Sequence, residues 1–300
     1  MSGKENNHNV CTHINSKLSQ AIKDDVNTLR NDLPTLRTSL VAIGDNQSLQ
    51  QHHAIMEWLS PIDFPAQQHD IITRRQKGTG QWFLDSAEFK RWLQGSEKTL
   101  FCPGIPGAGK TMIAAIAVDH LSGTIWCNDI GVAYMYCNYK ARADQSALNL
   151  LATLLKQLVQ SRPDIAAPVT CMYDHHSERR SRPSLDDVFG TLQSVCSNYA
   201  AVHIVVDALD ECTNGTRDQL IDKLRDLQTR ANVRLMFTSR FIPEIMENFA
   251  SIPNLEVRAS EDDVRRYVEG QIPRLPNCIK RDDELKRVVE NKIVDAVDGM

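Results

Sequence analysis

The sequence contains no long apolar run, no closely spaced cysteine pair and no excess of positive charge. Its longest apolar run, Met112–Val118, is far shorter than the about 20 residues of a membrane-spanning helix. Polar residues dominate Met1–Thr12 and no apolar core follows them, which argues against a secretory signal. A formal net charge of −4 gives no general attraction to nucleic acid or to anionic membranes. We therefore expect a soluble protein with no membrane span and no nucleic-acid partner.

The eight cysteines are scattered along the chain, and none forms a Cys-x-x-Cys pair. Several stand in apolar stretches, as small buried hydrophobic residues do, so a reducing, cytoplasmic compartment fits best. Cys171, His175 and His176 could be drawn as a metal site, but no second ligand pair follows at the usual zinc spacing. An ordinary polar loop is the preferred interpretation of that segment.

The N-terminal region carries a stripe of apolar residues after a polar start at residues 1–13. From Ile22 to Ile43 the apolar positions alternate four and three residues apart, which predicts a heptad-like helix that Pro34 interrupts. Two interpretations stay open: a coiled coil that drives oligomerisation, or a helical hairpin packed on its own domain. Residues 44–57, rich in Gln, Asn and His, indicate a linker.

From residue 99 onward, short β-rich segments alternate with segments of helical periodicity. The predicted strands cover residues 99–102, 132–138, 201–207, 233–238 and 255–258. Helices are predicted at 110–121, around 151–158, in the segment that carries Leu220 to Leu227, at 261–272 and at 283–297. Two of the helix starts resemble capping boxes, Asp85 with Glu88 and Thr216 with Gln219.

This alternation predicts an α/β fold in which helices flank a parallel sheet on both faces. An N-terminal helical segment would precede the sheet, and the start of a helical domain would follow it. The expected division is an N-terminal segment at 1–50, a linker and the segment before the core at 51–98, the α/β core at 99–260 and a helical subdomain from 261 to 300.

A phosphate-binding loop is the most specific motif in the chain. The residues from Gly104 to Thr111 satisfy G-x-x-x-x-G-K-[ST], with a strand before them and a helix after them. Glycines allow the backbone amides to turn toward a phosphate, and the helix directs the positive end of its dipole there. Lys110 would neutralise the β- and γ-phosphates, and Thr111 would bind Mg²⁺. The predicted nucleotide-binding residues are Gly104, Ile105, Pro106, Gly107, Ala108, Gly109, Lys110, Thr111 and Met112.

Acidic residues follow the apolar run that begins at His203. Asp207 ends this predicted strand and is the expected second Mg²⁺ ligand. A carboxylate just beyond the metal can orient the attacking water, for which Glu211 is the first choice and Asp210 the second. Arg240 follows the next strand, where a cation could sense the γ-phosphate or could be a plain surface arginine.

Five segments occur in an order that resembles a known family: Trp58–Phe64, Gly78–Leu84, Phe101–Thr111, Asp207–Glu211 and Phe237–Arg240. Together they look like the NACHT, or nephrocystin-3-like N-terminal, module of fungal NOD-like receptors, which belong to the STAND class of P-loop ATPases. The resemblance covers about residues 55–300. It places Gly78–Gly80 near the adenine and assigns Arg240 as the sensor residue.

The resemblance implies a nucleotide switch that uses ATP, ADP and Mg²⁺ and hydrolyses ATP slowly. In the family the ADP form is closed and monomeric, and ATP drives homo-oligomerisation toward a protein signalling partner in fungal non-self recognition or regulated cell death. Family members continue into a winged-helix region and ankyrin, WD40 or TPR repeats, whereas this sequence ends within the helical segment. A non-hydrolysing, nucleotide-bound adaptor acting through N-terminal helical association is the alternative function.

Overall fold

The computed structural model describes residues 50–124, 129–272 and 283–298. Contacts divide the chain into two units, Met1–Glu57 and Trp58–Met300. In the first unit residues 50–57 are helical, where the polar composition indicated a linker. The predicted heptad stripe lies outside the described residues. Among the described residues, no helix is long and apolar enough to cross a bilayer.

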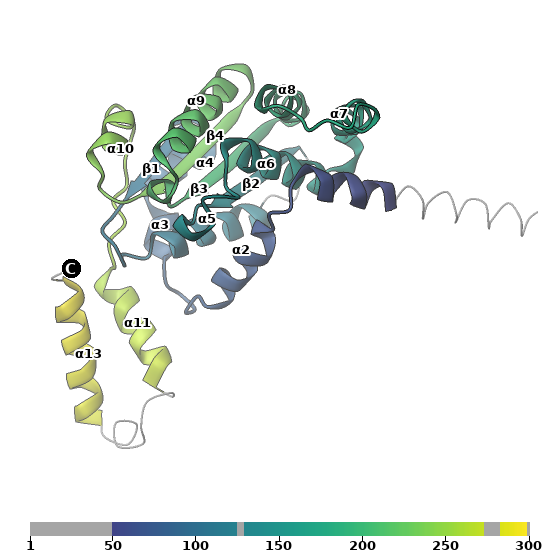
Figure 1. Ribbon diagram of the computed structural model, residues 1–300. Coiled ribbons are helices and arrows are strands. Elements are labelled where there is room, and N and C mark those ends of the chain that lie inside the picture. The colour runs from purple at the N-terminus through teal and green to yellow at the C-terminus, as the bar shows by residue number, and fades with distance from the viewer. Residues whose placement is uncertain (1–49, 125–128, 273–282, 299–300) are drawn as a thin grey trace, which may run out of the picture. The chain divides into compact units, whose positions relative to one another are not determined.

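The second unit contains a four-stranded parallel sheet in the order β1-β4-β3-β2 (Figure 1). The strands are β1 (Thr99–Pro103), β2 (Ile130–Tyr136), β3 (Ala201–Asp207) and β4 (Val233–Ser239). Every residue of β3 is buried, as expected for a strand at the centre of a covered sheet. The predicted α/β fold with a parallel sheet is confirmed.

Helices cover both faces of the sheet. Right-handed crossovers that run in opposite directions along a sheet place their helices on opposite faces. The connection from β1 to β2 runs through α5 (Lys110–Thr124), and the connections from β2 to β3 and from β3 to β4 return in the opposite direction. Figure 1 shows α5 on one face and the helices of the returning connections on the other. Those helices are α6 (Ala147–Ser161), α7 (Ala167–Glu178), α8 (Leu185–Cys196) and α9 (Asn214–Arg230).

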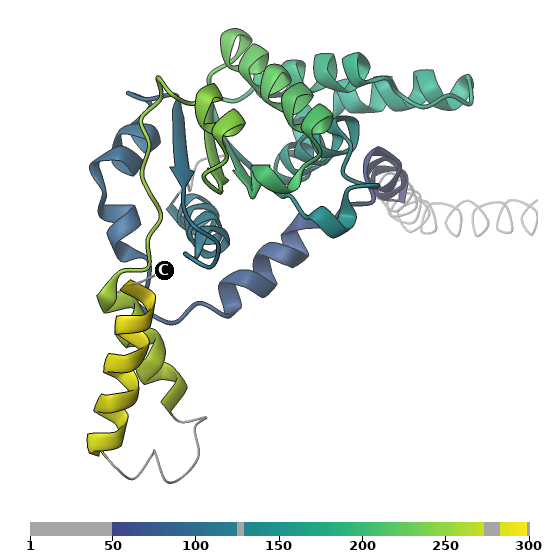
Figure 2. The same cartoon turned by 60° about the vertical axis from the view of Figure 1, so that its left-hand side comes forward.

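The remaining helices lie before and after the sheet in the chain. Of these, α2 (Phe64–Thr73) packs on α5, and α4 (Ala87–Gln94) contacts β1. The C-terminal helices α11 (Glu261–Gln271) and α13 (Asp283–Asp298) lie side by side (Figure 2). Short helices complete the described chain: α3 (Gln81–Asp85), α10 (Pro243–Asn248), η1 (Tyr139–Ala141), η2 (Pro163–Ile165) and η3 (Leu209–Glu211).

Buried polar contacts join α2 to the sheet and to α5. Gln68 donates to the carbonyl of Ala115 at 3.0 Å and accepts a hydrogen bond from the Tyr136 hydroxyl. Helix α5 is therefore covered on both sides, by the sheet and by α2. This explains why residues 113–118 are all buried and why its sequence is apolar rather than amphipathic.

The segment at 255–258, which was predicted as a last strand, runs alongside β1 but is not a regular strand. A single bridge pairs Asn254 with Phe101, and the amides of Leu255 and Val257 donate to Phe101 and Pro103 at 2.9 and 2.7 Å. The segment extends the parallel edge beside β1. It carries the chain to the phosphate loop before α11 begins.

Both predicted capping boxes are wrong in position. Thr213, not Thr216, caps α9 and accepts a hydrogen bond from the Thr216 amide, and Ser86, not Asp85, caps α4. A cap residue needs an extended backbone, which Thr213 and Ser86 have with ψ of 153° and 148°. Neither α7 nor α8 was predicted, although α8 begins with a complete capping box formed by Ser184 and Asp187.

The burial of His203 in β3 leads to a prediction about how the stability of the fold changes at acidic pH. Burial and the charge of Arg234 lower the pKa of His203 to about 4, whereas the unfolded chain titrates near its ordinary value of 6.5. The unfolded state therefore binds more protons between these pH values, and stability is lost as the pH falls from 6.5 toward 4. We expect His203→Phe to remove on the order of 3 kcal/mol of this loss, measured by urea unfolding across that range. Parallel pH profiles for the two proteins would contradict the assignment.

Candidate nucleotide-binding site

The phosphate loop lies between β1 and α5, as the motif predicts. Gly107 and Gly109 have φ of 82° and 91°, conformations that favour glycine. Gly104 is required for another reason, because a Cβ there would lie 2.5 Å from the carbonyl oxygen of Val257. Its amide donates to the carbonyl of Ser239 at 3.1 Å, which ties the start of the loop to the end of β4.

Lys110 begins α5, and its side chain turns back over the loop. The ammonium group donates to the carbonyls of Gly104 and Ile105 at 2.8 and 2.7 Å. Burial lowers the pKa of Lys110, while the carboxylates of Asp210 and Asp207 act in the opposite direction. The loop thus holds a cation near the acidic residues at the carboxyl end of β3.

Asp207 lies at the carboxyl end of β3 and is 2% exposed. Its Oδ1 accepts a hydrogen bond from the Thr238 hydroxyl at 2.6 Å, and that hydroxyl accepts one from the Ala208 amide at 2.9 Å. Burial raises the pKa of Asp207 to about 6, although the hydroxyls of Thr238 and Thr111 and the charge of Lys110 favour the carboxylate. Sequence reasoning gave Thr238 no role of its own, although the residue lies in the segment Phe237–Arg240 that carries the family resemblance.

The residues at this edge fit a magnesium-bound phosphate. Thr111 and Asp207, which come together here, offer the oxygen ligands that Mg²⁺ prefers. Space remains inside the loop, since a Cβ at Gly107 or Gly109 would meet no atom within 4 Å. Among the described residues no group of three or more His, Cys, Asp or Glu side chains could hold a metal ion, and Cys171 is an exposed residue of α7.

Asp210 and Arg240 are paired with each other. The Arg240 amide donates to Asp210 Oδ1 at 3.0 Å and its Nε donates to Oδ2 at 2.5 Å. The carboxylate is nearly inaccessible, whereas the arginine side chain is 49% exposed. Both oxygens of Asp210 therefore hold the arginine at the end of β4. Asp210 positions Arg240 and does not act as a general base.

Glu211 ends the short helix η3 and faces the segment after β2. Its Oε2 accepts a hydrogen bond from the Tyr139 amide at 3.0 Å, and its carbonyl accepts one from Arg142 Nε at 2.9 Å. The residue is only partly buried, unlike Asp210. Of the two carboxylates proposed to orient water, Glu211 is the accessible one.

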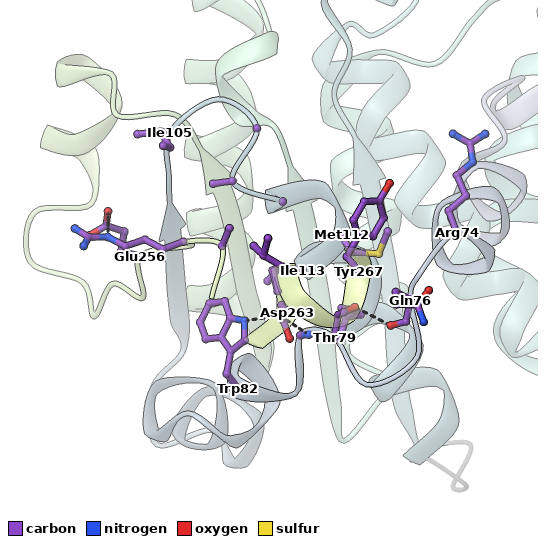
Figure 3. A pocket seen from close by; sticks show the side chains of 18 of the residues that line it. Arg74, Gln76, Thr79, Trp82, Ile105, Met112, Ile113, Glu256, Asp263 and Tyr267 are labelled. Carbon is purple, nitrogen blue, oxygen red and sulfur yellow. Dashed lines mark hydrogen bonds and ion pairs between the residues drawn. The ribbon is translucent and has the colours of Figure 1, made fainter. Parts of the chain in front are cut away.

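A cavity of about 780 Å³ adjoins the phosphate loop. Its walls come from the loop, from the turn at 74–82, from the segment at 256–259 and from α11 and α13. Figure 3 shows Asp263 of α11 beside Trp82 and Thr79 of this turn. Its carboxylate accepts hydrogen bonds from the Gly80 amide at 2.7 Å and from Trp82 Nε1 at 3.1 Å. Thr79 and Gly80 thus line the same cavity as Met112. The sequence did not single out Asp263, an ordinary acidic residue in the first turn of a helix.

Comparisons with known proteins agree with this arrangement. The family model for the N-terminal region of nephrocystin 3 matches residues 78–240. The vegetative incompatibility protein HET-E-1 of Podospora anserina is 24% identical over 214 residues, which cover 67% of this chain and 16% of that protein. The chain therefore spans less than a fifth of that relative's length.

Among solved structures, two proteins show limited similarity to this chain. The Aeropyrum pernix Orc1 protein in complex with DNA is 18% identical at a TM-score of 0.41, covering 63% of this chain and 48% of that one. AMPPCP-bound DnaA from Aquifex aeolicus is 12% identical at a TM-score of 0.41, covering 75% and 62%. Both scores are below 0.5, so the fold assignment depends on the strand order of the chain itself.

The close approach at Gly104 generates a prediction about stability. Gly104→Ala would force the new methyl group against the backbone at Val257, and we expect the free energy of unfolding to fall by about 1–3 kcal/mol. Gly123→Ala is the matched control, since its Cβ meets open space near the end of α5 and alanine favours helix. Denaturant titration measures both. Equal stability of Gly104→Ala and the parent would refute the steric argument.

Proposed function

The chain belongs to the family of the nephrocystin 3 N-terminal domain, which confirms the resemblance to NACHT modules, and from this premise we propose that it is an ATP-dependent switch with slow hydrolysis. One observation carries the proposal: the Gly104–Thr111 loop, Asp207 and Glu211 are gathered at a single edge of the sheet. The adjoining cavity is large enough for a nucleoside.

In this proposal the phosphate loop binds the triphosphate through its backbone amides. Lys110 Nζ exchanges the carbonyls of Gly104 and Ile105 for β- and γ-phosphate oxygens, which are stronger, charged acceptors. The base and ribose occupy the cavity bounded by Gly80, Met112 and α11. The phosphate motif does not select the base, so ATP over GTP follows from the family resemblance.

In this proposal, metal binding, orientation of the water and the holding of Arg240 fall to Thr111 and the acidic residues. Thr111 and Asp207 would hold Mg²⁺, which neutralises charge on the phosphates. Glu211 orients the attacking water, and the Tyr139 amide fixes the direction of its carboxylate. Asp210 holds Arg240 at the end of β4, from where the guanidinium senses the γ-phosphate.

The biological role that we propose is signalling in the cytoplasm. The name of HET-E-1 assigns that relative to vegetative incompatibility, and we extend fungal non-self recognition or regulated cell death to this chain. ATP binding would drive homo-oligomerisation and recruitment of a protein signalling partner. Native mass spectrometry in ADP and in a non-hydrolysable ATP analogue tests this. An unchanged oligomer mass would exclude ATP-driven assembly.

A second candidate is a nucleotide-bound adaptor that does not hydrolyse ATP. The observation in its favour is that both carboxylates after Asp207 already have partners, Arg240 for Asp210 and Tyr139 for Glu211. Association through the N-terminal helical segment would then be the activity. Turnover measurements distinguish the two functions.

Loss of the loop lysine should weaken nucleotide binding. Lys110→Ala removes a charge-assisted contact inside a confined anion site, and we expect the dissociation constant for ATP to rise by about tenfold to a hundredfold. Isothermal titration measures it. Lys90→Ala is the control, because Lys90 is exposed in α4 and its contact is a surface ion pair with Asp85. Equal ATP affinities of Lys110→Ala and Lys90→Ala would mean that the phosphates do not bind at this loop.

Replacing the proposed water-orienting residue should separate turnover from binding. Glu211→Gln keeps the shape of the side chain but not its charge, and we expect ATP turnover to fall by about a hundredfold or more at unchanged ATP affinity. Glu244→Gln, on the exposed start of α10, is the matched control. A parent protein that binds ATP but shows no turnover would favour the adaptor.

A further inference from the structure

Helix α11 is fastened to the turn that leads into α3 and to α3 itself. Asp263 Oδ2 accepts hydrogen bonds from both the Gly80 amide at 2.7 Å and Trp82 Nε1 at 3.1 Å. Three residues farther along α11, Arg266 donates to the carbonyl of Gly78 at 2.6 Å. A charged group takes part in each of these hydrogen bonds, which makes them stronger than bonds between neutral groups. The contacts therefore fix the position of α11 against this turn.

The two segments that Asp263 joins are each ordered by contacts of their own. Ser260 caps α11 and its hydroxyl accepts a hydrogen bond from the Asp263 amide at 3.2 Å. On the other side, Arg75 donates to the carbonyl of Thr79 from Nε at 3.0 Å and from a terminal nitrogen at 2.6 Å. Because neither segment has to be ordered by the Asp263 contact, that contact sets their relative position.

Tyr267 follows Asp263 by four residues on α11. Residues four apart are neighbours on one face of a helix, so the contact that fixes Asp263 also fixes the direction in which Tyr267 projects. Tyr267 lines the cavity beside the phosphate loop, although 53% of the residue is exposed. Figure 3 shows its side chain at the cavity together with that of Met112 from α5. A large aromatic ring is thus held at the cavity without being packed into the core.

The lining of this cavity favours an aromatic ring that is attached to a chain of phosphates. The phosphate loop at 105–109 forms one part of the wall. Apolar side chains from three helices form another part: Met112, Ile113 and Ile116 of α5, Val264 of α11 and Ile293 of α13. Aromatic side chains stack on the flat face of a nucleobase, and a methionine sulfur contacts aromatic rings favourably.

We propose that Tyr267 stacks on the nucleobase and that Asp263 is the positioning residue that holds Tyr267 over the cavity. The inference rests on the proposed function, because it names the side chains that bind the base of the same nucleotide. The Asp263 carboxylate is engaged by the Gly80 amide and Trp82 Nε1, so it acts on the base through the placement of α11. A stacking face accepts every base, and Tyr267 therefore adds affinity without selecting ATP over GTP.

Loss of the ring should weaken the binding of nucleotides but not of bare phosphates. We expect Tyr267→Ala to raise the dissociation constant for ATP by about tenfold or more, and that for GTP by a similar factor. Inorganic tripolyphosphate fills the phosphate loop but has no base, so its affinity should not change. Tyr267→Phe keeps the ring and should restore the affinity for ATP.

Asp263→Ala should reproduce this loss through the displacement of α11. We expect the dissociation constant for ATP to rise by about tenfold, again without an effect on tripolyphosphate. Since Asp263 acts through Tyr267, the variant that combines both alanines should bind ATP within about twofold of Tyr267→Ala alone. Asp262→Ala is the matched control, because Asp262 is an exposed acidic residue in the same first turn of α11.

Isothermal titration of the full chain with ATP, GTP and tripolyphosphate, each with Mg²⁺, measures these affinities. Unchanged ATP affinity of Tyr267→Ala, or equal losses for ATP and tripolyphosphate, overturns the stacking role. Additive losses in the double variant, or an equal loss in Asp262→Ala, overturn the positioning role of Asp263. A parent protein that binds tripolyphosphate as tightly as ATP refutes the inference and leaves the phosphate site in place. If the parent binds neither, the proposed function itself fails and the inference falls with it.

Discussion

The hydrogen bond from the Thr238 hydroxyl to the Asp207 carboxylate is the interaction on which the rest of the site depends. Asp207 ends a strand that is buried over its whole length, where a carboxylate without a partner would be costly. The same hydroxyl accepts the Ala208 amide, so one side chain of β4 holds both the carboxylate and the turn after it. The parallel register brings Pro103 and Ser239 to this edge as well, which places the phosphate loop beside Asp207.

Contacts between neighbouring strands then give the two following carboxylates different tasks. Asp210 is turned toward β4 and holds Arg240, whereas Glu211 is turned toward the segment after β2 and meets Tyr139. The chemistry of this loop is therefore set by the packing of the strands on either side of β3.

The sequence predicted the elements whose signals are local. The phosphate loop is a contiguous motif, and the buried runs that form β3 and β4 contain β-branched and apolar residues bounded by polar ones. Parallel pairing followed from their alternation with helices, and Asp207 was found because it ends such a run. Helix α7 was missed because its segment carries a weak apolar pattern with many polar residues, whereas α8 was missed although its capping box and apolar face were present in the sequence.

By itself the sequence determined the fold class, the phosphate loop and the acidic strand end, since each depends on residues adjacent in the chain. Only the tertiary structure decided that Thr238 serves Asp207 and that Asp263 closes the cavity against the turn at Gly80. These contacts join segments as far as 183 residues apart. No periodicity or spacing encodes them, because they exist only once the strands have paired and their ends lie along one edge.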